Sequence, residues 1–375
     1  MANRDDIRAT VIVADQLHQR VLGGIGTYTK NVLERLCADA SAAANEELVL
    51  FASAPSKRVD RRSPLEQIRS TQELRFARTP QPLAQRLWDH GLDGPPFPWK
   101  TMHSMSMGGP KPRRLRADQD LSFTVFDTAW ITQPESFPAH GRKWHEATFN
   151  FIKATATMVV TASEFASDAI VNAGLDRARI RVIPPGSDHL PPADHGRAQE
   201  LLRALGVRSE YVLTVSTLEP RKNLPMLVDS FRELRMTLTD PYDLVIVGPK
   251  GWGDDLEEAP GIKLAGFVEP SVLAGLYSGA RAFVYVPLEE GFGLPVLEAF
   301  SQCIPVVASK IPASVVGALH VDPRDRDSIV EGLHRVLSDD ALRSSLVTEG
   351  LQVAQEHSWD RAAEAHAQLL KELAR

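Results

Sequence analysis

Cysteine is rare in this chain of 375 residues, which contains only Cys37 and Cys303. Two cysteines far apart in the sequence are too few for a framework of disulfide bonds or a structural zinc site. Both stand among apolar neighbours, so we expect buried, reduced thiols. His103, His140, His145 and His189 are not spaced as metal ligands. The sequence therefore predicts no bound metal.

The chain also lacks a long apolar run. No stretch could span a bilayer as a helix, and the first residues, Met1 to Arg8, lack the apolar segment of a secretory signal. We therefore expect a cytoplasmic protein. Aromatic residues make up 7% of the chain and do not interleave its basic clusters, so no nucleic-acid partner is expected.

Acidic residues outnumber basic residues by 48 to 42, which gives a net charge of -6, but the excess is uneven. Residues 1–188 carry 24 Lys and Arg against 21 Asp and Glu, or +3, which leaves 18 against 27, or -9, for the remainder. The basic clusters of the first part are Lys57, Arg58, Arg61, Arg62 and Arg69, and Lys111, Arg113, Arg114 and Arg116. They are either solvated surface or a site for an anionic acceptor or anionic lipid at the inner membrane face.

The length favours two domains, and both halves alternate short β-branched runs with helical patterns. This alternation is typical of an α/β fold with a parallel sheet covered on both sides. The predicted strands are 8–14, 48–52, 122–126, 158–161 and 181–183 in the first half, and 211–215, 244–247, 262–265, 282–286 and 306–308 in the second. Helices are predicted over 27–40, after a glycine-rich turn, and over 359–373.

A segment rich in Pro, Asp and His, 187–196, predicts a linker between the halves. We expect a first domain of residues 1–188 and a second of residues 189–356, with a ligand cleft between the carboxyl ends of their strands. The last helix, within 357–375, could pack on either half. Residues 80–112 are rich in Gly and Pro and predict a long surface loop that carries specificity.

Glu290 and Glu298 bracket a glycine-rich segment that reads as a loop leading into a helix. Gly293 lets the backbone approach a ligand, and Pro295 suits the first helical position, so Glu298 is expected in the first turn. An ionised carboxylate only accepts hydrogen bonds, so Glu298 could bind the two hydroxyls of a ribose diol. The alternative is a carboxylate that interacts with the helix dipole.

Arg221 and Lys222 directly follow the predicted strand 211–215. Two adjacent cations at the carboxyl end of a strand could hold a diphosphate, Arg as a planar fork and Lys as a point charge. A solvated turn before a helix starting near Pro225 is the alternative. Both interpretations stay open from this pair alone.

Two candidates lie in the first half. The backbone amides of Gly23 and Gly24, at the start of the first helix, could receive phosphate oxygens, although a tight turn explains these glycines equally well. Asp127 ends the strand 122–126, the usual place for a site residue, but an N-cap or Asx turn accounts for it as well.

Taken together, these residues resemble a retaining glycosyltransferase of family 4, the group 1 transferases. That family has the GT-B fold, in which two Rossmann-like parallel-sheet domains face each other across a cleft. The matching segments occur in the family's order along the chain: 23–28, 160–165, 181–186, 219–223, 266–268, 279–283, 290–298 and 305–309.

The resemblance implies that the second domain binds a nucleotide-diphosphate sugar. Arg221 and Lys222 would hold the diphosphate, Glu298 the ribose hydroxyls, and Glu290 a hydroxyl of the transferred sugar. The backbone near Val268 would face the base. The backbone that would approach the sugar and phosphate belongs to Phe292, Gly293, Leu294 and Pro295.

For the first domain, the resemblance implies that Gly23 and Gly24 close onto the diphosphate, that the acceptor binds there, and that the final helix crosses back to it. Asp127 aligns with an aspartate that many relatives place after a histidine. The leaving diphosphate would be stabilised by Arg221 and Lys222 with no metal or other cofactor, and transfer would retain the anomeric configuration by front-face attack.

The segment 23–28 looks most like the mannosyl- and rhamnosyltransferase branch, which favours GDP-mannose or a dTDP-sugar as donor and a glycan, lipid-linked sugar or small molecule as acceptor. Two features depart from the family pattern. Phe126 occupies the position of the usual histidine, and the segment 309–320 is short and lacks an acidic residue. They leave open an enzyme that hydrolyses, phosphorolyses or epimerises its substrate, or a protein that binds sugar nucleotides without turnover.

Overall fold

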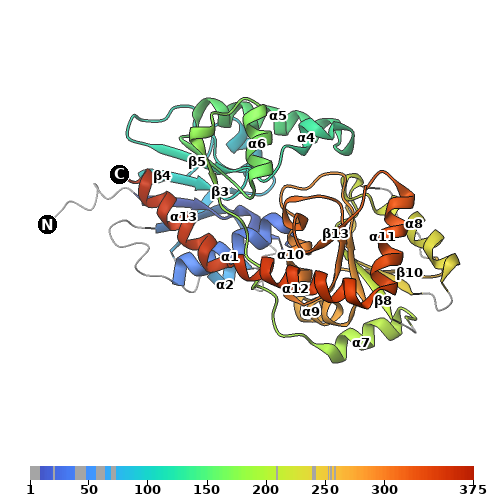
Figure 1. Cartoon of the computed structure of the whole chain (residues 1–375). Helices are drawn as coiled ribbons and strands as arrows, with labels where there is room; N and C mark the ends of the chain where they lie inside the picture. The colour runs from blue at the N-terminus through green and yellow to red at the C-terminus, as the bar shows by residue number, and fades with distance from the viewer. Residues whose placement is uncertain are drawn as a thin grey trace. The chain divides into compact units, whose positions relative to one another are not determined.

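The computed structural model describes residues 9–19, 22–38, 48–55, 64–68, 73–207, 210–238, 242–251, 253, 256 and 259–375. The chain forms two compact units (Figure 1). The first contains Met1–Thr132, Phe137–Pro185 and Trp359–Arg375, and the second contains Gln133–Ser136 and Gly186–Ser358. The domain boundaries predicted above, at 188/189 and 356/357, lie a few residues from these divisions.

The first unit is built on a seven-stranded sheet of order β3-β2-β1-β4-β5-β6-β7, in which all neighbours are parallel. Its strands are β1 (Ala9–Val13), β2 (Leu48–Ala54), β3 (Leu74–Pro80), β4 (Trp99–Ser104), β5 (Asp120–Thr124), β6 (Met158–Thr161) and β7 (Ile180–Val182). Apolar side chains of β1, β2 and β5, such as Val11, Phe51 and Phe123, are fully buried in its core. The strand order reverses between β1 and β4.

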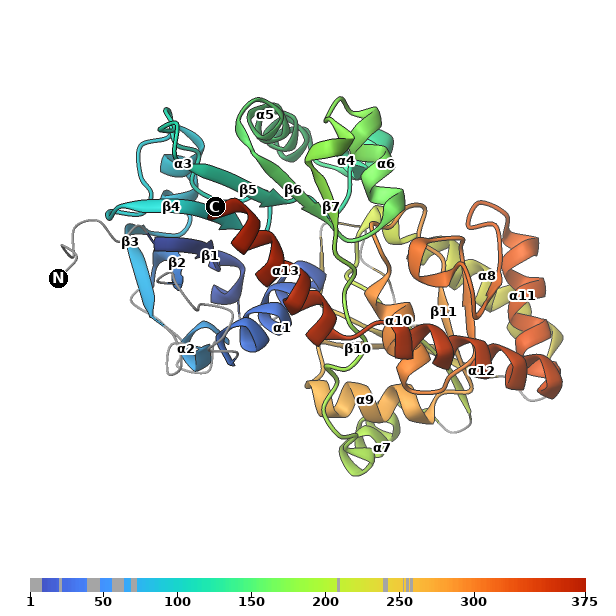
Figure 2. The ribbon, with the colours of Figure 1, turned by 60° about the vertical axis from the view of Figure 1, so that its left-hand side comes forward.

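The helices described in the first unit are α1 (Gly24–Ala38), α2 (Pro64–Ile68), α3 (Leu83–Asp89), α4 (Ala129–Thr132), α5 (Ala139–Thr155), α6 (Glu164–Asn172) and α13 (Trp359–Leu373). Short 3-10 turns in this unit are η2 (Asp15–His18) and η4 (Arg177–Arg179), whereas η3 (Pro134–Ser136) belongs to the second unit. The last helix, α13, lies beside α1 (Figure 2). The final helix thus belongs to the first unit.

The expectation of a surface loop over 80–112 was wrong, because this region contains α3 and the central strand β4. Thr101, Met102 and His103 of β4 are fully buried between β1 and β5. Polar residues interrupt the sequence Trp-Lys-Thr-Met-His-Ser and so hide a buried strand, although a polar side chain can find a partner inside. The Nδ1 atom of His103, for example, lies 2.8 Å from the hydroxyl of Ser122 in β5.

Two expectations about surface chemistry also change. Lys111 is buried and binds the carboxylate of Asp89 and the hydroxyl of Thr148, so it does not belong to a solvated basic cluster, whereas the arginines of that cluster are exposed. The cluster between 57 and 69 lies outside the described residues. Cys303 is exposed and Cys37 is half-buried, so the prediction of buried thiols was wrong for Cys303.

The second unit has a six-stranded parallel sheet of order β10-β9-β8-β11-β12-β13. Its strands are β8 (Tyr211–Val215), β9 (Asp243–Val247), β10 (Ile262–Gly266), β11 (Ala282–Tyr285), β12 (Val306–Ala308) and β13 (Ala318–His320). Its helices are α7 (His195–Ala204), α8 (Leu224–Thr237), α9 (Pro270–Gly279), α10 (Leu294–Ser301), α11 (Arg326–Ser338) and α12 (Asp340–Glu356), with 3-10 turns η5 (Pro220–Lys222) and η6 (Pro312–Ser314). The strand order reverses between β8 and β11, so ligands are expected outside the carboxyl ends of these two strands.

Candidate active site

The two cations predicted as a diphosphate clamp lie at the reversal point of the second sheet. Arg221 and Lys222 end the short turn η5, which follows β8, and the segment after β11 carries Glu290. The backbone N–H of Leu288 donates to the carbonyl of Arg221 over 2.9 Å, which ties the two segments together. The fold thus brings together residues that lie far apart in the sequence.

Asn223 fixes the turn from the other side. It adopts a left-handed backbone conformation with φ of 60°, which asparagine tolerates better than most residues. Its side-chain amide donates to the carbonyl of Val286 at 3.1 Å and to that of Pro323 at 2.7 Å. The backbone of η5 is therefore held against the segment that carries Glu290.

Glu290 forms ion pairs with both Arg221 and Lys222. Its Oε2 atom accepts a hydrogen bond from the ammonium of Lys222 and a longer one, 3.4 Å, from Nη1 of Arg221. It also accepts from the hydroxyl of Tyr285 at 2.8 Å. On the other side of Arg221, the Nε atom lies 3.3 Å from the carboxylate of Glu219. Two positive and two negative charges therefore balance in this cluster.

Burial and charge act in opposite directions on Glu290. Burial alone would raise the pKa of its carboxyl, but the positive charges of Lys222 and Arg221 bring that pKa down to about 2. Burial, and then the charge of Arg221, lower the pKa of Lys222. Glu290 is thus a carboxylate at neutral pH, and a carboxylate held by two cations is a poor nucleophile.

Glu298 has a different environment. Its Oε1 atom lies 3.0 Å from Nε2 of His189, and its Oε2 atom accepts from the hydroxyl of Tyr277 at 2.8 Å. The side chain is 9% exposed, like that of His189. Helix α10 begins at Leu294 after Gly293, so Glu298 lies in the second turn, and its expected place in the first turn was wrong.

The backbone between the two glutamates needs a glycine. Gly293 has a φ of 107°, and a Cβ atom there would lie 2.5 Å from the Cδ1 atom of Ile311. The carbonyl of Phe292 accepts from the N–H of Ala313 at 2.9 Å. Pro295 lies in the first turn of α10. The short segment 309–320 therefore braces the loop from Phe292 to Pro295.

The other predicted site residues are placed as follows. Val268, which is 9% exposed, lies between β10 and α9 in the second unit. Gly23 and Gly24 lie at the start of α1 in the first unit, and the carbonyl of Gly23 accepts from the N–H of Thr27 at 2.9 Å. Asp127, beyond the end of β5 in the same unit, accepts from the N–H of Ala129 at 3.1 Å, as expected of an Asx turn.

Phe126 is half-buried in the first unit. Its ring packs edge-on against that of Tyr28, with 5.0 Å between the ring centroids. This position therefore supplies no hydrogen-bonding group.

Sequence reasoning missed three residues that contact the two glutamates. Tyr285 ends β11, and its place at the carboxyl end of a predicted strand was a usable signal. Tyr277 and His189 gave no such signal, because their contacts with Glu298 join segments that are distant in sequence.

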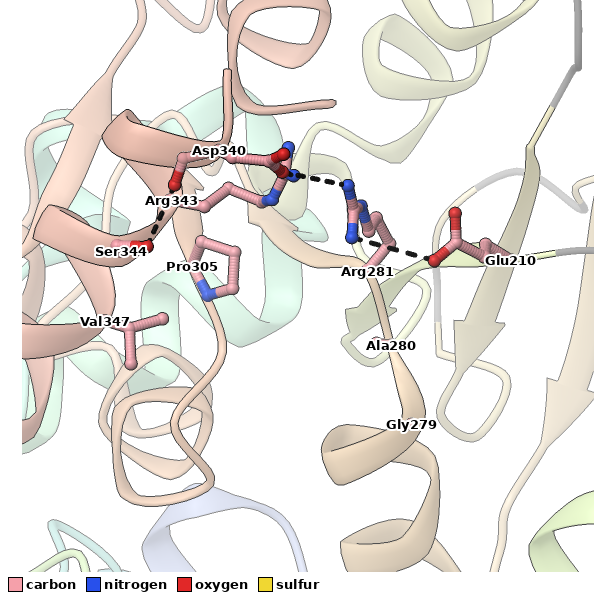
Figure 3. Close-up of a pocket in the computed structure, with 9 residues that line it drawn as sticks. All are labelled: Glu210, Gly279, Ala280, Arg281, Pro305, Asp340, Arg343, Ser344 and Val347. Carbon is pink, nitrogen blue, oxygen red and sulfur yellow. Dashed lines mark hydrogen bonds and ion pairs between the residues drawn. The ribbon is translucent and has the colours of Figure 1, made fainter. Parts of the chain in front are cut away.

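Within the described residues, no group of three or more His, Cys, Asp and Glu side chains could hold a metal ion. None of the helices described is long and apolar enough to cross a membrane. A cavity of about 580 Å³ lies in the second unit. Figure 3 shows the residues that line it, among which Arg281 lies between Glu210 and Asp340. Glu210 directly precedes β8 and Arg281 directly precedes β11, so the cavity lies at the amino ends of these strands. The candidate site lies at their carboxyl ends and is therefore separate from the cavity.

The comparisons with known proteins agree with this geometry. Residues 203–353, which carry the Arg221, Lys222 and Glu290 cluster, match the family "Glycosyl transferases group 1". The O-antigen chain mannosyltransferase B of Escherichia coli is 31% identical over 376 residues, which cover 93% of this chain and 96% of that protein. The chain belongs to the group 1 glycosyltransferases.

Solved structures show the fold of this glycosyltransferase. Sucrose-phosphate synthase from Thermosynechococcus elongatus superposes with a TM-score of 0.71 at 17% identity, covering 98% of this chain and 99% of that one. HepE from Anabaena, in complex with UDP and glucose, gives a TM-score of 0.70 at 16% identity, with 97% and 100% covered. The two Rossmann-like parallel-sheet domains are those of the GT-B fold.

Proposed function

We propose that this glycosyltransferase transfers mannose from GDP-mannose to a hydroxyl of a glycan or lipid-linked sugar, with retention of configuration. The observation that carries the proposal is the cluster of Arg221, Lys222 and Glu290 at the carboxyl ends of β8 and β11. The name of the Escherichia coli relative supports mannose as the sugar and a glycan chain as the acceptor. A dTDP-sugar donor and a small-molecule acceptor are the competing assignments.

Charge explains how the cluster would act. Breaking the anomeric bond places negative charge on the departing diphosphate, and Arg221 and Lys222 would stabilise that charge in the transition state. Two fixed cations can do this without a metal ion, so we propose metal-independent transfer. The roles expected of Gly23, Gly24 and Asp127 in the first unit stay predictions.

The two glutamates would bind the donor rather than react with it. Glu298 would accept hydrogen bonds from the ribose hydroxyls, and Glu290 would accept one from the sugar. Because the positive charges of Lys222 and Arg221 lower the pKa of Glu290 and with it the basicity of the carboxylate, Glu290 is poorly suited to attack the anomeric carbon. This arrangement favours front-face attack by the acceptor hydroxyl.

Donor binding and turnover test the proposal. GDP should raise the melting temperature more than UDP, ADP or dTDP, because ligands that bind only the folded state stabilise it. Purified protein with GDP-mannose and a mannose-containing acceptor should then release GDP, with and without EDTA. Lys222→Ala should lower kcat/KM about a hundredfold or more, in the range found when one transition-state donor is removed.

Three results would overturn parts of the proposal. Loss of turnover in EDTA would exclude the metal-independent mechanism. Unchanged turnover in both Lys222→Ala and Glu298→Ala would exclude the site. Stoichiometric consumption of GDP-mannose without an acceptor would instead identify a hydrolase.

A further inference from the structure

The two oxygens of Glu290 have unequal environments. Oε2 accepts from Lys222, Arg221 and Tyr285, whereas no hydrogen bond to Oε1 is found among the described residues. Glu298 differs, because each of its oxygens has its own protein partner, His189 for one and Tyr277 for the other. Glu290 therefore keeps one acceptor atom for a ligand.

Tyr285 closes the arrangement around Oε2. Its hydroxyl accepts from the ammonium of Lys222 at 2.7 Å and donates to Oε2 of Glu290 at 2.8 Å. The ammonium also lies 5.4 Å from the centroid of the Tyr285 ring. Lys222, Tyr285 and Glu290 thus form a closed triangle of hydrogen bonds in a buried place.

We propose that Tyr285 is a positioning residue for donor binding, which holds the Lys222 ammonium toward the diphosphate and turns Oε1 of Glu290 toward a hydroxyl of the transferred sugar. The inference rests on the function proposed above and adds to it a residue that orients both partners. Tyr285 itself contacts neither the diphosphate nor the sugar in this role.

Side-chain torsions explain why such a residue is needed. The last torsion of glutamate is soft and broad, so packing alone does not select which oxygen faces a ligand. The ammonium of lysine ends a flexible four-carbon stem. A hydroxyl that donates to one group and accepts from the other restricts both at once.

Removing only the hydroxyl tests this role. Tyr285→Phe keeps the ring, its packing against Phe283 and the cation–π contact with Lys222. We expect Kd for GDP-mannose, measured by calorimetry, to rise about tenfold, as for a lost hydrogen bond to a charged group. Kd for GDP should rise less, because GDP has no sugar for Oε1 to bind.

A matched control comes from the opposite end of the same sheet. The hydroxyl of Tyr211 is buried and donates to the carbonyl of Leu276 at 2.6 Å, away from the candidate site. Tyr211→Phe should lower the melting temperature but leave both Kd values and kcat/KM unchanged. The control separates loss of a buried tyrosine hydroxyl from loss of donor positioning.

The pH profile gives a readout that a purely structural role would not move. Burial lowers the pKa of Lys222, and Tyr285 supplies an acceptor that favours its charged form. In Tyr285→Phe the alkaline limb of kcat/KM should therefore shift to lower pH. Burial and the charge of Glu290 raise the pKa of Tyr285 well above its usual range, so Tyr285 does not titrate in this window.

The outcomes distinguish this inference from the proposed function. The assays are run with GDP-mannose and GDP, and in parallel with UDP-glucose and UDP. If the wild type binds none of these four ligands, both the proposed function and the inference that rests on it are overturned. If the wild type binds and turns over a donor, but Tyr285→Phe behaves like Tyr211→Phe, the inference alone is overturned.

Discussion

At the scale of single residues, Glu290 and Glu298 show how one side-chain type takes two roles. Glu290 faces two cations, whereas Glu298 faces the imidazole of His189 and the hydroxyl of Tyr277. The cations hold Glu290 ionised, with a pKa of about 2, although burial alone would have the opposite effect. The stability that Glu290 contributes should therefore depend on pH.

Glu290→Gln should destabilise the protein most above pH 4.5. A carboxyl whose pKa falls from 4.5 to about 2 on folding contributes about 3 kcal/mol at neutral pH as an upper value. That contribution is present above the unfolded pKa and is lost as pH falls from about 4.5 toward 2. Urea unfolding of wild type and variant across this range measures the difference.

The control for this prediction is Glu164→Gln. Glu164 also pairs with an arginine, Arg177, but its side chain is 68% exposed, so the change should stay within about 0.5 kcal/mol. If the difference in unfolding free energy between wild type and Glu290→Gln did not shrink as the pH falls, the ion pair of Glu290 with Lys222 and Arg221 would be contradicted.

Gly293→Ala should strain the loop before α10. A φ of 107° is unfavourable for alanine, and its Cβ atom would crowd Ile311 and Ala313. We expect a loss of about 1 to 3 kcal/mol in unfolding free energy and weaker donor binding. Urea denaturation and calorimetry with GDP-mannose measure the two effects.

Gly141→Ala is the matched control for that change. Gly141 lies in α5, its φ is not positive, and a Cβ atom there would meet nothing within 4 Å. Alanine should stabilise this helix by about 0.5 to 1 kcal/mol. Equal effects of the two substitutions would show that the backbone at Gly293 is not constrained.

At the scale of elements, a buried polar group joins α13 to the first sheet. The hydroxyl of Tyr28 in α1 donates to the carbonyl of Ile183 and lies 2.9 Å from Nε2 of His366 in α13. The ring of His366 lies 5.3 Å from that of His103 in β4. All three side chains are almost completely buried, so charging either histidine is unfavourable.

The docking of α13 should weaken at acid pH. Burial lowers the pKa of His103 to about 4, and burial with the neighbouring His103 lowers that of His366. A histidine with a lowered folded-state pKa contributes stability above its unfolded value, near 6.5, and loses it as pH falls toward 4. Protonation of His103 alone should lower the unfolding free energy by up to about 3 kcal/mol.

Comparison with a variant isolates this effect from the carboxyl groups. His103→Gln keeps a polar side chain near Ser122 and Thr124 but cannot be protonated. Urea unfolding at pH 7, 6, 5 and 4 should show a shallower decline for the variant than for the wild type. Parallel curves would mean that the buried histidines do not control acid stability.

The same elements show what sequence could and could not predict. Continuous apolar runs gave the bounds of β6, β8 and β12 correctly, and the apolar spacing of α13 did the same. The strand β4 was not predicted because Lys100 and His103 interrupt its apolar pattern. The start of α10 was missed because the left-handed backbone of Gly293 lets the helix begin at Leu294.

At the scale of the whole molecule, the sequence predicted the family but not all of the side-chain contacts in the site. The order of the motifs along the chain indicated the family, and the reversal of strand order between β8 and β11 explains why Arg221 and Glu290 meet. The partners of Glu298 were not predictable, because His189 and Tyr277 approach it only in the folded chain. Long-range contacts of this kind leave no local pattern.

The uneven charge leads to a prediction about membranes. Residues 1–188 carry +3 while the remainder carries -9, and Arg113, Arg114 and Arg116 are exposed, although Lys111 beside them is buried. We propose peripheral contact of this arginine cluster with anionic lipid. An arginine near such a surface contributes about 1 kcal/mol, and salt screens the attraction.

Vesicle sedimentation tests that contact. The wild type should bind vesicles that contain phosphatidylglycerol at low salt and release them as the salt concentration rises. Changing Arg113, Arg114 and Arg116 together to Gln should weaken binding by roughly two orders of magnitude if each contributes about 1 kcal/mol. Arg197→Gln, at an exposed position in the second unit, should change nothing. Binding that is insensitive to salt would rule out an electrostatic origin, and equal binding by the triple variant would exclude this cluster.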